Sequence, residues 1–152
     1  MAMNTPHTLR ASDLLFPTPV SIEDRDGSYR LHSTTTIAAS PPFEETADTA
    51  AALLGCKRGG EDILFKHIEG LDDEEYRLSI STVQVVITAS TTRGAFHGLS
   101  AVRKLALIND NILPACRVCD KPAFVWRGFM LDCVRHFFSV DFIKKLIDAA
   151  SL

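Results

Sequence analysis

Cysteine and histidine are two residue types in this chain that could bind a metal ion, and cysteine could also carry redox chemistry. Among the four cysteines, Cys56, Cys116, Cys119 and Cys133, only Cys116 and Cys119 are closely spaced. A structural zinc site needs about four ligands. In addition, this Cys-x-x-Cys pair lies in a strand-like segment and not at the βα turn that thioredoxin-like enzymes use. We therefore expect ordinary thiols without a metal or redox role.

The histidines are equally scattered along the chain. There are five, at His7, His32, His67, His97 and His136. No two are four positions apart, so the His-Glu-x-x-His zinc motif of metalloproteases is absent. The sequence therefore predicts no metal site and no cofactor, which argues against a peptidase.

Charge is distributed unevenly along the chain. Residues 44–76 contain ten acidic and three basic residues, whereas residues 77–152 contain ten basic and five acidic ones, and the net charge is −3. We interpret the acidic stretch as a solvated surface, because nothing specific supports the alternative of an acidic docking surface. The mild acidity argues against a nucleic-acid partner, which usually requires a basic face. No run reaches the roughly 20 apolar residues that span a bilayer, and no secretory signal peptide is evident, so the compartment stays open.

The elements that must position any site are read from hydrophobic spacing. Residues 1–13 are polar and predict a flexible N-terminus, and residues 14–120 predict an α+β domain, a sheet with two helices on one face. Alternation at Tyr76, Leu78 and Ile80 is typical of a half-buried strand. The expected elements are an extended edge segment over 14–22, a turn over 24–28, a strand beginning over 29–32, a helix from about residue 40 to Gly55, an antiparallel hairpin formed by 76–81 and 83–87, a helix capped by Thr92, and strands over 63–68 and 112–118.

Residues 121–152 form a different kind of segment. An apolar strand is expected over Val125–Leu131, and Ser139 is expected to cap a helix whose apolar face includes Ile143 and Ile147. One strand and one helix cannot bury both faces of a parallel strand. The sequence therefore looks like a chain that stops just after entering a second domain. We expect this segment to pack back on the first domain, to self-associate or to be mobile.

Residues 122–148 contain a long specific motif: Arg127-Gly128, then Met130-Leu131-Asp132, Arg135-His136-Phe137 and Ile143-Lys144-Lys145. This motif resembles the opening of the catalytic barrel of glycoside hydrolase family 20, the β-N-acetylhexosaminidases. Two upstream segments, 75–80 and 94–99, resemble the small domain that precedes the barrel in that family. The resemblance implies a small domain with a zincin-like fold, followed over 121–152 by the first strand and helix of an incomplete (β/α)8 barrel.

The resemblance also implies a chemistry. Family members are retaining hydrolases that remove terminal N-acetylglucosamine or N-acetylgalactosamine, and the acetamido oxygen of the substrate is the nucleophile. An adjacent Asp-Glu pair deep in the barrel orients that amide and protonates the leaving oxygen. The sole Asp-Glu dipeptide here, Asp73–Glu74, precedes the barrel, and we interpret it as surface charge. No catalytic residue is therefore assigned, and the chain alone is expected to be inactive.

Arg135 is the one functional residue that the resemblance carries over. In the family, the arginine of the Arg-His-Phe motif binds hydroxyls of the terminal sugar, and its guanidinium fork suits vicinal hydroxyls. We expect this contact only in a complete barrel, and the alternative is a structural arginine paired with Asp132. Two interpretations of the whole chain stay open. It is the non-catalytic N-terminal part of a β-N-acetylhexosaminidase acting on terminal N-acetylhexosamine glycans, or it is a free-standing accessory module with the same fold and no catalysis.

Overall fold

The computed structural model describes residues 9–152 and divides the chain into two compact units, Met1–Lys121 and Pro122–Leu152. We call them unit 1 and unit 2 and describe each by itself. Unit 1 is built on a single mixed sheet, in the strand order β1-β7-β5-β6-β4-β2-β3. The strands are β1 (Ser21–Arg30), β2 (Thr36–Ala39), β3 (Lys57–Arg58), β4 (Ile63–His67), β5 (Tyr76–Ile80), β6 (Val85–Ala89) and β7 (Ile112–Asp120).

Strand direction changes midway across the sheet. β3, β2, β4 and β6 run parallel to one another, whereas β5 pairs antiparallel with β6, β7 with β5, and β1 with β7. The expected hairpin is confirmed, because β5 and β6 pair antiparallel with Leu78 opposite Ile87. On β5, the alternating residues Tyr76, Leu78 and Ile80 are buried, while Arg77 faces solvent. One face of the sheet therefore forms the core.

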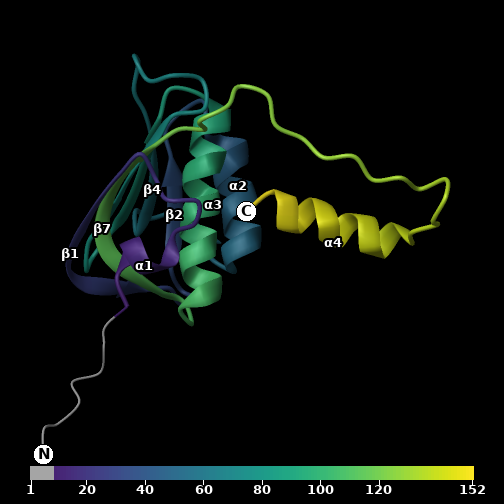
Figure 1. Cartoon of the computed structure of the whole chain (residues 1–152). Coiled ribbons are helices and arrows are strands. Elements are labelled where there is room, and N and C mark those ends of the chain that lie inside the picture. The colour runs from purple at the N-terminus through teal and green to yellow at the C-terminus, as the bar shows by residue number, and fades with distance from the viewer. Residues whose placement is uncertain (1–8) are drawn as a thin grey trace, which may run out of the picture. The chain divides into compact units, whose positions relative to one another are not determined.

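Two long helices, α2 (Glu44–Leu54) and α3 (Thr92–Ile108), cover that face side by side (Figure 1). The arrangement confirms the expected α+β class. α2 buries small residues, Ala47 and Ala50, whereas α3 buries a full stripe of residues with helical spacing. The expected stop is present, because Gly55 ends α2 in the left-handed conformation. The predicted cap Thr92 is wrong by one residue: the side chain of Thr91 accepts from the Gly94 amide, and Thr92 is the first residue of α3.

Other local features also differ from what the sequence predicts. The strand near the N-terminus is Ser21–Arg30, so the predicted turn over 24–28 is instead an irregularity in the β1–β7 register. The predicted flexible N-terminus lies partly outside the described residues, and residues 11–13 belong to the short helix α1 (Ala11–Leu14), where Ala11 is fully buried. β2 and β3 were not predicted, because each is too short to show a hydrophobic period. The predicted strand over Val125–Leu131 is irregular chain.

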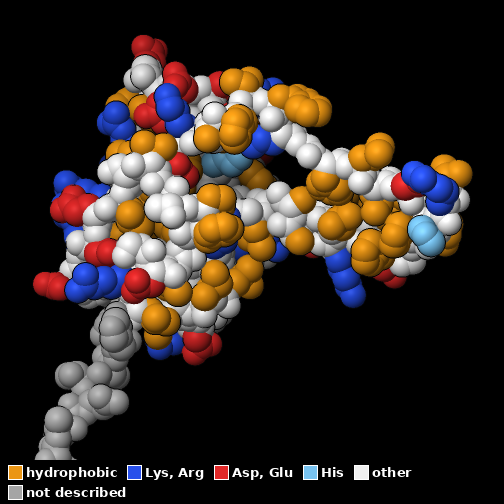
Figure 2. All heavy atoms as spheres, viewed as in Figure 1, with side chains coloured by type: hydrophobic (Ala, Val, Ile, Leu, Met, Phe, Trp, Pro, Cys, Tyr) orange, Lys and Arg blue, Asp and Glu red, His pale blue; other side chains and the backbone are white. Residues whose placement is uncertain are grey.

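Unit 2 consists of that irregular segment and of helix α4 (Val140–Ala150). The Ser139 side chain accepts from the Phe142 amide, so the predicted cap is confirmed. Not one residue of α4 is buried. Figure 2 shows hydrophobic side chains along this unit, and many are largely exposed. They are Phe124, Val125, Trp126, Phe129, Met130, Val134, Phe137, Val140, Phe142 and Ile147. Unit 2 therefore has no core of its own.

Candidate functional site

Arg135 lies in the irregular segment of unit 2, a few residues before α4. Its side chain is 81% exposed, and it forms an ion pair through Nε with Oδ2 of Asp132, which is 31% exposed. The other carboxylate oxygen of Asp132, Oδ1, accepts from the amides of Val134 at 2.9 Å and Arg135 at 3.1 Å. One carboxylate therefore binds both the main chain and the side chain of the arginine.

These contacts keep the Asp132 carboxyl ionised beside the Arg135 guanidinium. The amide of Arg135, the amide of Val134 and the Arg135 guanidinium, in that order of influence, lower the pKa of the Asp132 carboxyl. Each of these donors favours the ionised acid. Asp132 therefore stays a carboxylate at neutral pH, and Arg135, as an arginine, stays a cation.

The residues around Arg135 form an exposed strip. Cys133, Val134 and His136 are exposed, and Phe138 stacks on Phe142 with ring centroids 4.8 Å apart. Earlier in the segment, the Arg127 side chain donates from Nη1 to the carbonyl of Phe124. The strip can therefore supply hydrogen-bond donors to a ligand.

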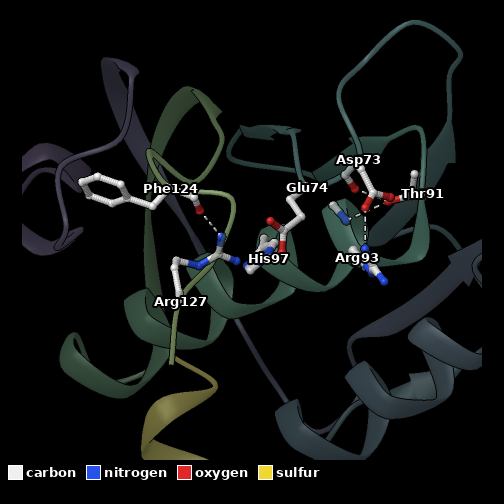
Figure 3. Close-up of polar contacts among 8 residues, drawn as sticks. Asp73, Glu74, Thr91, Arg93, His97, Phe124 and Arg127 are labelled. Carbon is white, nitrogen blue, oxygen red and sulfur yellow. Dashed lines mark hydrogen bonds and ion pairs between the residues drawn. The ribbon is translucent and has the colours of Figure 1, made fainter. Parts of the chain in front are cut away.

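The Asp73–Glu74 dipeptide lies in unit 1, in the loop before β5 (Figure 3). Asp73 pairs with Arg93 on α3 at 2.6 Å, and its carbonyl accepts from the Thr91 hydroxyl. Glu74 lies 3.3 Å from Nε2 of His97, one helical turn further along. The two carboxylates therefore bind different side chains of α3 and hold the loop on the helix.

The sequence predicts no metal site, and cysteines without a metal or redox role. Within residues 9–152, no group of three or more His, Cys, Asp or Glu side chains is placed to hold a metal ion. Cys116 is buried and Cys119 is exposed, because residues three apart on β7 face opposite sides of the sheet. Burial, followed by the nearby Asp24 carboxylate, raises the pKa of Cys116 to about 12. His7 lies outside the described residues.

Comparison with known proteins places this geometry in a family. The profile described as "Glycosyl hydrolase family 20, domain 2" matches residues 14–121, and "Glycosyl hydrolase family 20, catalytic domain" matches residues 124–152. The chain belongs to glycosyl hydrolase family 20. Unit 1 thus corresponds to a domain that precedes the catalytic domain, and the Asp132–Arg135 pair lies in the part that matches the catalytic domain.

Relatives in this family are similar along nearly the whole chain. A β-N-acetylhexosaminidase of Cellulomonas fimi is 31% identical over 88% of this chain, and a β-hexosaminidase of Vibrio furnissii is 32% identical over 94%. The structure of the family 20 β-N-acetylhexosaminidase of Streptomyces coelicolor superposes with a TM-score of 0.79, at 30% identity over 93% of this chain. An exo-β-N-acetylglucosaminidase of Vibrio harveyi, solved with N-acetylglucosamine, gives a TM-score of 0.80 at 27% identity over 91%.

These relatives are much longer than this chain. The chain covers 31% of the Cellulomonas protein, 25% of the Vibrio furnissii protein, and 33% and 24% of the two solved structures. Only 29 residues, 124–152, match the catalytic domain. Within residues 9–152, every helix is too short or too polar to cross a membrane.

Proposed function

We propose that this chain is the non-catalytic N-terminal part of a β-N-acetylhexosaminidase. It comprises the small α+β domain over 14–120 and, over 121–152, the first strand and helix of the catalytic barrel. The complete enzyme would remove terminal N-acetylglucosamine or N-acetylgalactosamine from glycans. The observation that carries the proposal is the continuous match to two successive family 20 domains, which join at residues 121–124.

The chemistry of the complete enzyme would be substrate-assisted. The acetamido oxygen of the terminal sugar attacks the anomeric carbon, and the configuration is retained. Neither an acid for the leaving oxygen nor a carboxylate to orient the acetamido group is assigned in this chain, because Asp73 and Glu74 belong to the small domain. No metal or cofactor is required in this proposal.

Arg135 is the residue of this chain that would touch the substrate. Barrel enzymes build their sites at the C-terminal ends of the strands, and Arg135 follows the segment that would form the first barrel strand in the complete enzyme. Its guanidinium is exposed and held at one edge by Asp132. It would donate hydrogen bonds to hydroxyls of the terminal sugar, which decides binding and orientation but not bond cleavage.

The first test is activity with a chromogenic N-acetylglucosaminide. The 152-residue chain should give no turnover above a buffer blank, whereas a complete enzyme that carries residues 1–152 as its N-terminal part should hydrolyse it. Turnover by the short chain that survives repurification would contradict the proposal. It would equally be contradicted if the complete enzyme cleaved only other glycosides.

The second test is Arg135→Ala in that complete enzyme. Hydrogen bonds to charged groups contribute roughly 1.5–3 kcal/mol each, so kcat/KM should fall by about one to two powers of ten. Lys144→Ala is the matched control, because it removes an exposed cation of α4 in the same unit. An unchanged kcat/KM for Arg135→Ala would show that the arginine is structural.

A further inference from the structure

The carboxylate of Asp132 is shared between two tasks. Its Oδ1 binds the amides of Val134 and Arg135 and so closes the turn of main chain that carries Arg135. Its Oδ2 accepts from Nε of the same arginine. Side chains of aspartate commonly close turns in this way, but the additional bond to Nε also restricts the side chain that the turn presents.

Asp132 binds Nε of Arg135, and this determines which guanidinium nitrogens are left to bind a ligand. In the described part of the chain, the contacts of Arg135 use its main-chain amide and Nε, and none uses Nη1 or Nη2. These two terminal nitrogens carry four of the five guanidinium N–H groups. They form the outer edge of the fork, and the side chain is 81% exposed. The ion pair therefore orients the guanidinium without occupying the edge that binds a ligand.

We propose that Asp132 is a positioning residue that orients Arg135 for the sugar hydroxyls, an inference that rests on the proposed function of Arg135. Asp132 does not touch the substrate. It fixes the main chain of residue 135 through Oδ1 and the plane of the guanidinium through Oδ2. A long arginine side chain otherwise loses rotamer freedom on binding, and a group oriented in advance avoids that cost.

The charge of the pair supports this role. The lowered pKa of Asp132 keeps it ionised at the pH values at which Arg135 must donate. A neutral acid would accept less well from Nε and would add a competing donor. The ion-pair alternative raised by the sequence and the sugar-binding role are thus compatible, because they use different nitrogens of one guanidinium.

Asp132→Asn separates the two tasks. The asparagine carbonyl oxygen can still accept from the two main-chain amides, but its NH2 group cannot accept from Nε. Arg135→Lys breaks the same contact from the other side, because lysine keeps the charge and has no Nε to hold. Asp148→Asn is the matched control, since it removes an exposed carboxylate from α4 in the same unit.

The experiment uses a complete enzyme that carries residues 1–152 and measures kcat/KM for three chromogenic substrates. These are the N-acetylglucosaminide and its 3-deoxy and 4-deoxy analogues. The ratio of kcat/KM between the parent and each deoxy substrate reports the contact with that hydroxyl. A general loss of folding or activity lowers all three values together and leaves the ratios unchanged.

Asp132→Asn should lower the ratio of kcat/KM between the parent and at least one deoxy substrate by about fivefold or more. Arg135→Lys should lower it to a similar extent. This size is within the range that one hydrogen bond to a charged group allows. In the Arg135→Ala background, Asp132→Asn should add nothing further, because the residue it positions is gone. Asp148→Asn should keep the wild-type ratios. Thermal melting of each variant checks that it is folded.

Other outcomes overturn the inference in distinguishable ways. If Asp132→Asn lowers kcat/KM equally for all three substrates, Asp132 is merely structural. If Asp132→Asn keeps the wild-type ratios while Arg135→Ala loses them, Arg135 is positioned by something else and the proposed function stands. If Arg135→Ala itself leaves the ratios unchanged, the proposed role of Arg135 fails, and the role of Asp132 fails with it.

Discussion

At the scale of single residues, two cysteines of β7 differ in their expected reactivity. Cys116 is fully buried and burial raises its pKa to about 12, whereas Cys119, three residues later, faces solvent. Because the thiolate is the reactive form, Cys119 and the exposed Cys133 should react with Ellman's reagent in the folded protein at pH 8, and Cys116 only after unfolding. Peptide mass spectrometry after partial labelling identifies the modified thiols. Rapid labelling of Cys116 under native conditions would contradict this register of β7.

A glycine on α3 sets how closely the helix approaches the sheet. A Cβ added at Gly98 would lie 2.6 Å from Cγ2 of Ile87 and 3.3 Å from Cδ2 of Tyr76. Alanine favours helices over glycine by about 1 kcal/mol, but overpacking a core costs typically 1–3 kcal/mol. Gly98→Ala should therefore lower the free energy of unfolding, as measured by urea denaturation.

Gly128→Ala is the matched control for that variant. A Cβ at Gly128 would meet no atom within 4 Å, so this substitution should leave the stability of the protein nearly unchanged. If Gly98→Ala proved as neutral as Gly128→Ala, the close approach of α3 to β5 and β6 would be wrong.

At the scale of secondary-structure elements, a single carboxylate joins β2 to the start of β4. Oδ2 of Asp62 accepts from the Thr36 amide at 2.8 Å and from the Thr36 hydroxyl at 2.7 Å. The hydroxyl, and after it the amide, lowers the pKa of Asp62. A carboxyl whose pKa is lowered by folding stabilises the protein above its unfolded-state pKa, about 3.9. That contribution is lost as the pH falls through the lower folded value.

Asp62→Asn should therefore destabilise the protein at pH 7, and by less as the pH falls below about 3.9. Hydrogen bonds to a charged group contribute roughly 1.5–3 kcal/mol, and partial exposure reduces this to about 1 kcal/mol. Thermal melting of wild type and variant at pH 7 and at pH 3 measures the difference. Glu61→Gln, which neutralises the adjacent exposed carboxylate, should show no comparable change. A difference between wild type and Asp62→Asn that grows toward low pH would reverse the assigned sign.

At the scale of the whole molecule, the two units differ in what they bury. Unit 1 has a continuous core under α2 and α3, whereas α4 in unit 2 buries nothing and most of its large apolar neighbours are exposed. Segments shorter than about 40 residues seldom fold alone, and large exposed apolar patches favour association. Unit 2 therefore needs a partner surface to become stable, which a complete barrel would supply.

A truncation after Lys121 tests this division. It keeps Asp120, whose carboxylate binds the Val20 amide and the Tyr76 hydroxyl, and it keeps the pair between Lys121 and Asp72. The truncated protein should fold cooperatively by thermal melting and be more monomeric than the full chain by light scattering. If residues 1–121 fail to fold, the segment after Lys121 is integral to the small domain and the predicted boundary is wrong.

Local patterns in the sequence determined much of this result. Alternation at Tyr76, Leu78 and Ile80 identified β5 and its hairpin, and helical spacing with Gly55 and Ser139 identified α2 and α4. These features arise from contacts between residues that are close in the chain, so they leave a periodic signal. The family could also be recognised from the sequence, because the motif over 127–145 is long and lies in one stretch of the chain. The same motif alone indicated Arg135 as a candidate site residue.

Tertiary structure decided what depends on distant residues. β2 and β3 exist because parallel neighbours complete their hydrogen bonds. β1 continues beyond the predicted turn because β7 pairs with it on both sides, at residues 21–24 and at residues 28–30. The expected strand over 125–131 does not form in unit 2, since a parallel strand needs neighbouring strands that this unit lacks. The sequence suggested that Asp132 pairs with Arg135, but only the folded turn shows that the pair uses Nε. Which nitrogen is bound depends on side-chain geometry, and spacing along the chain does not encode it.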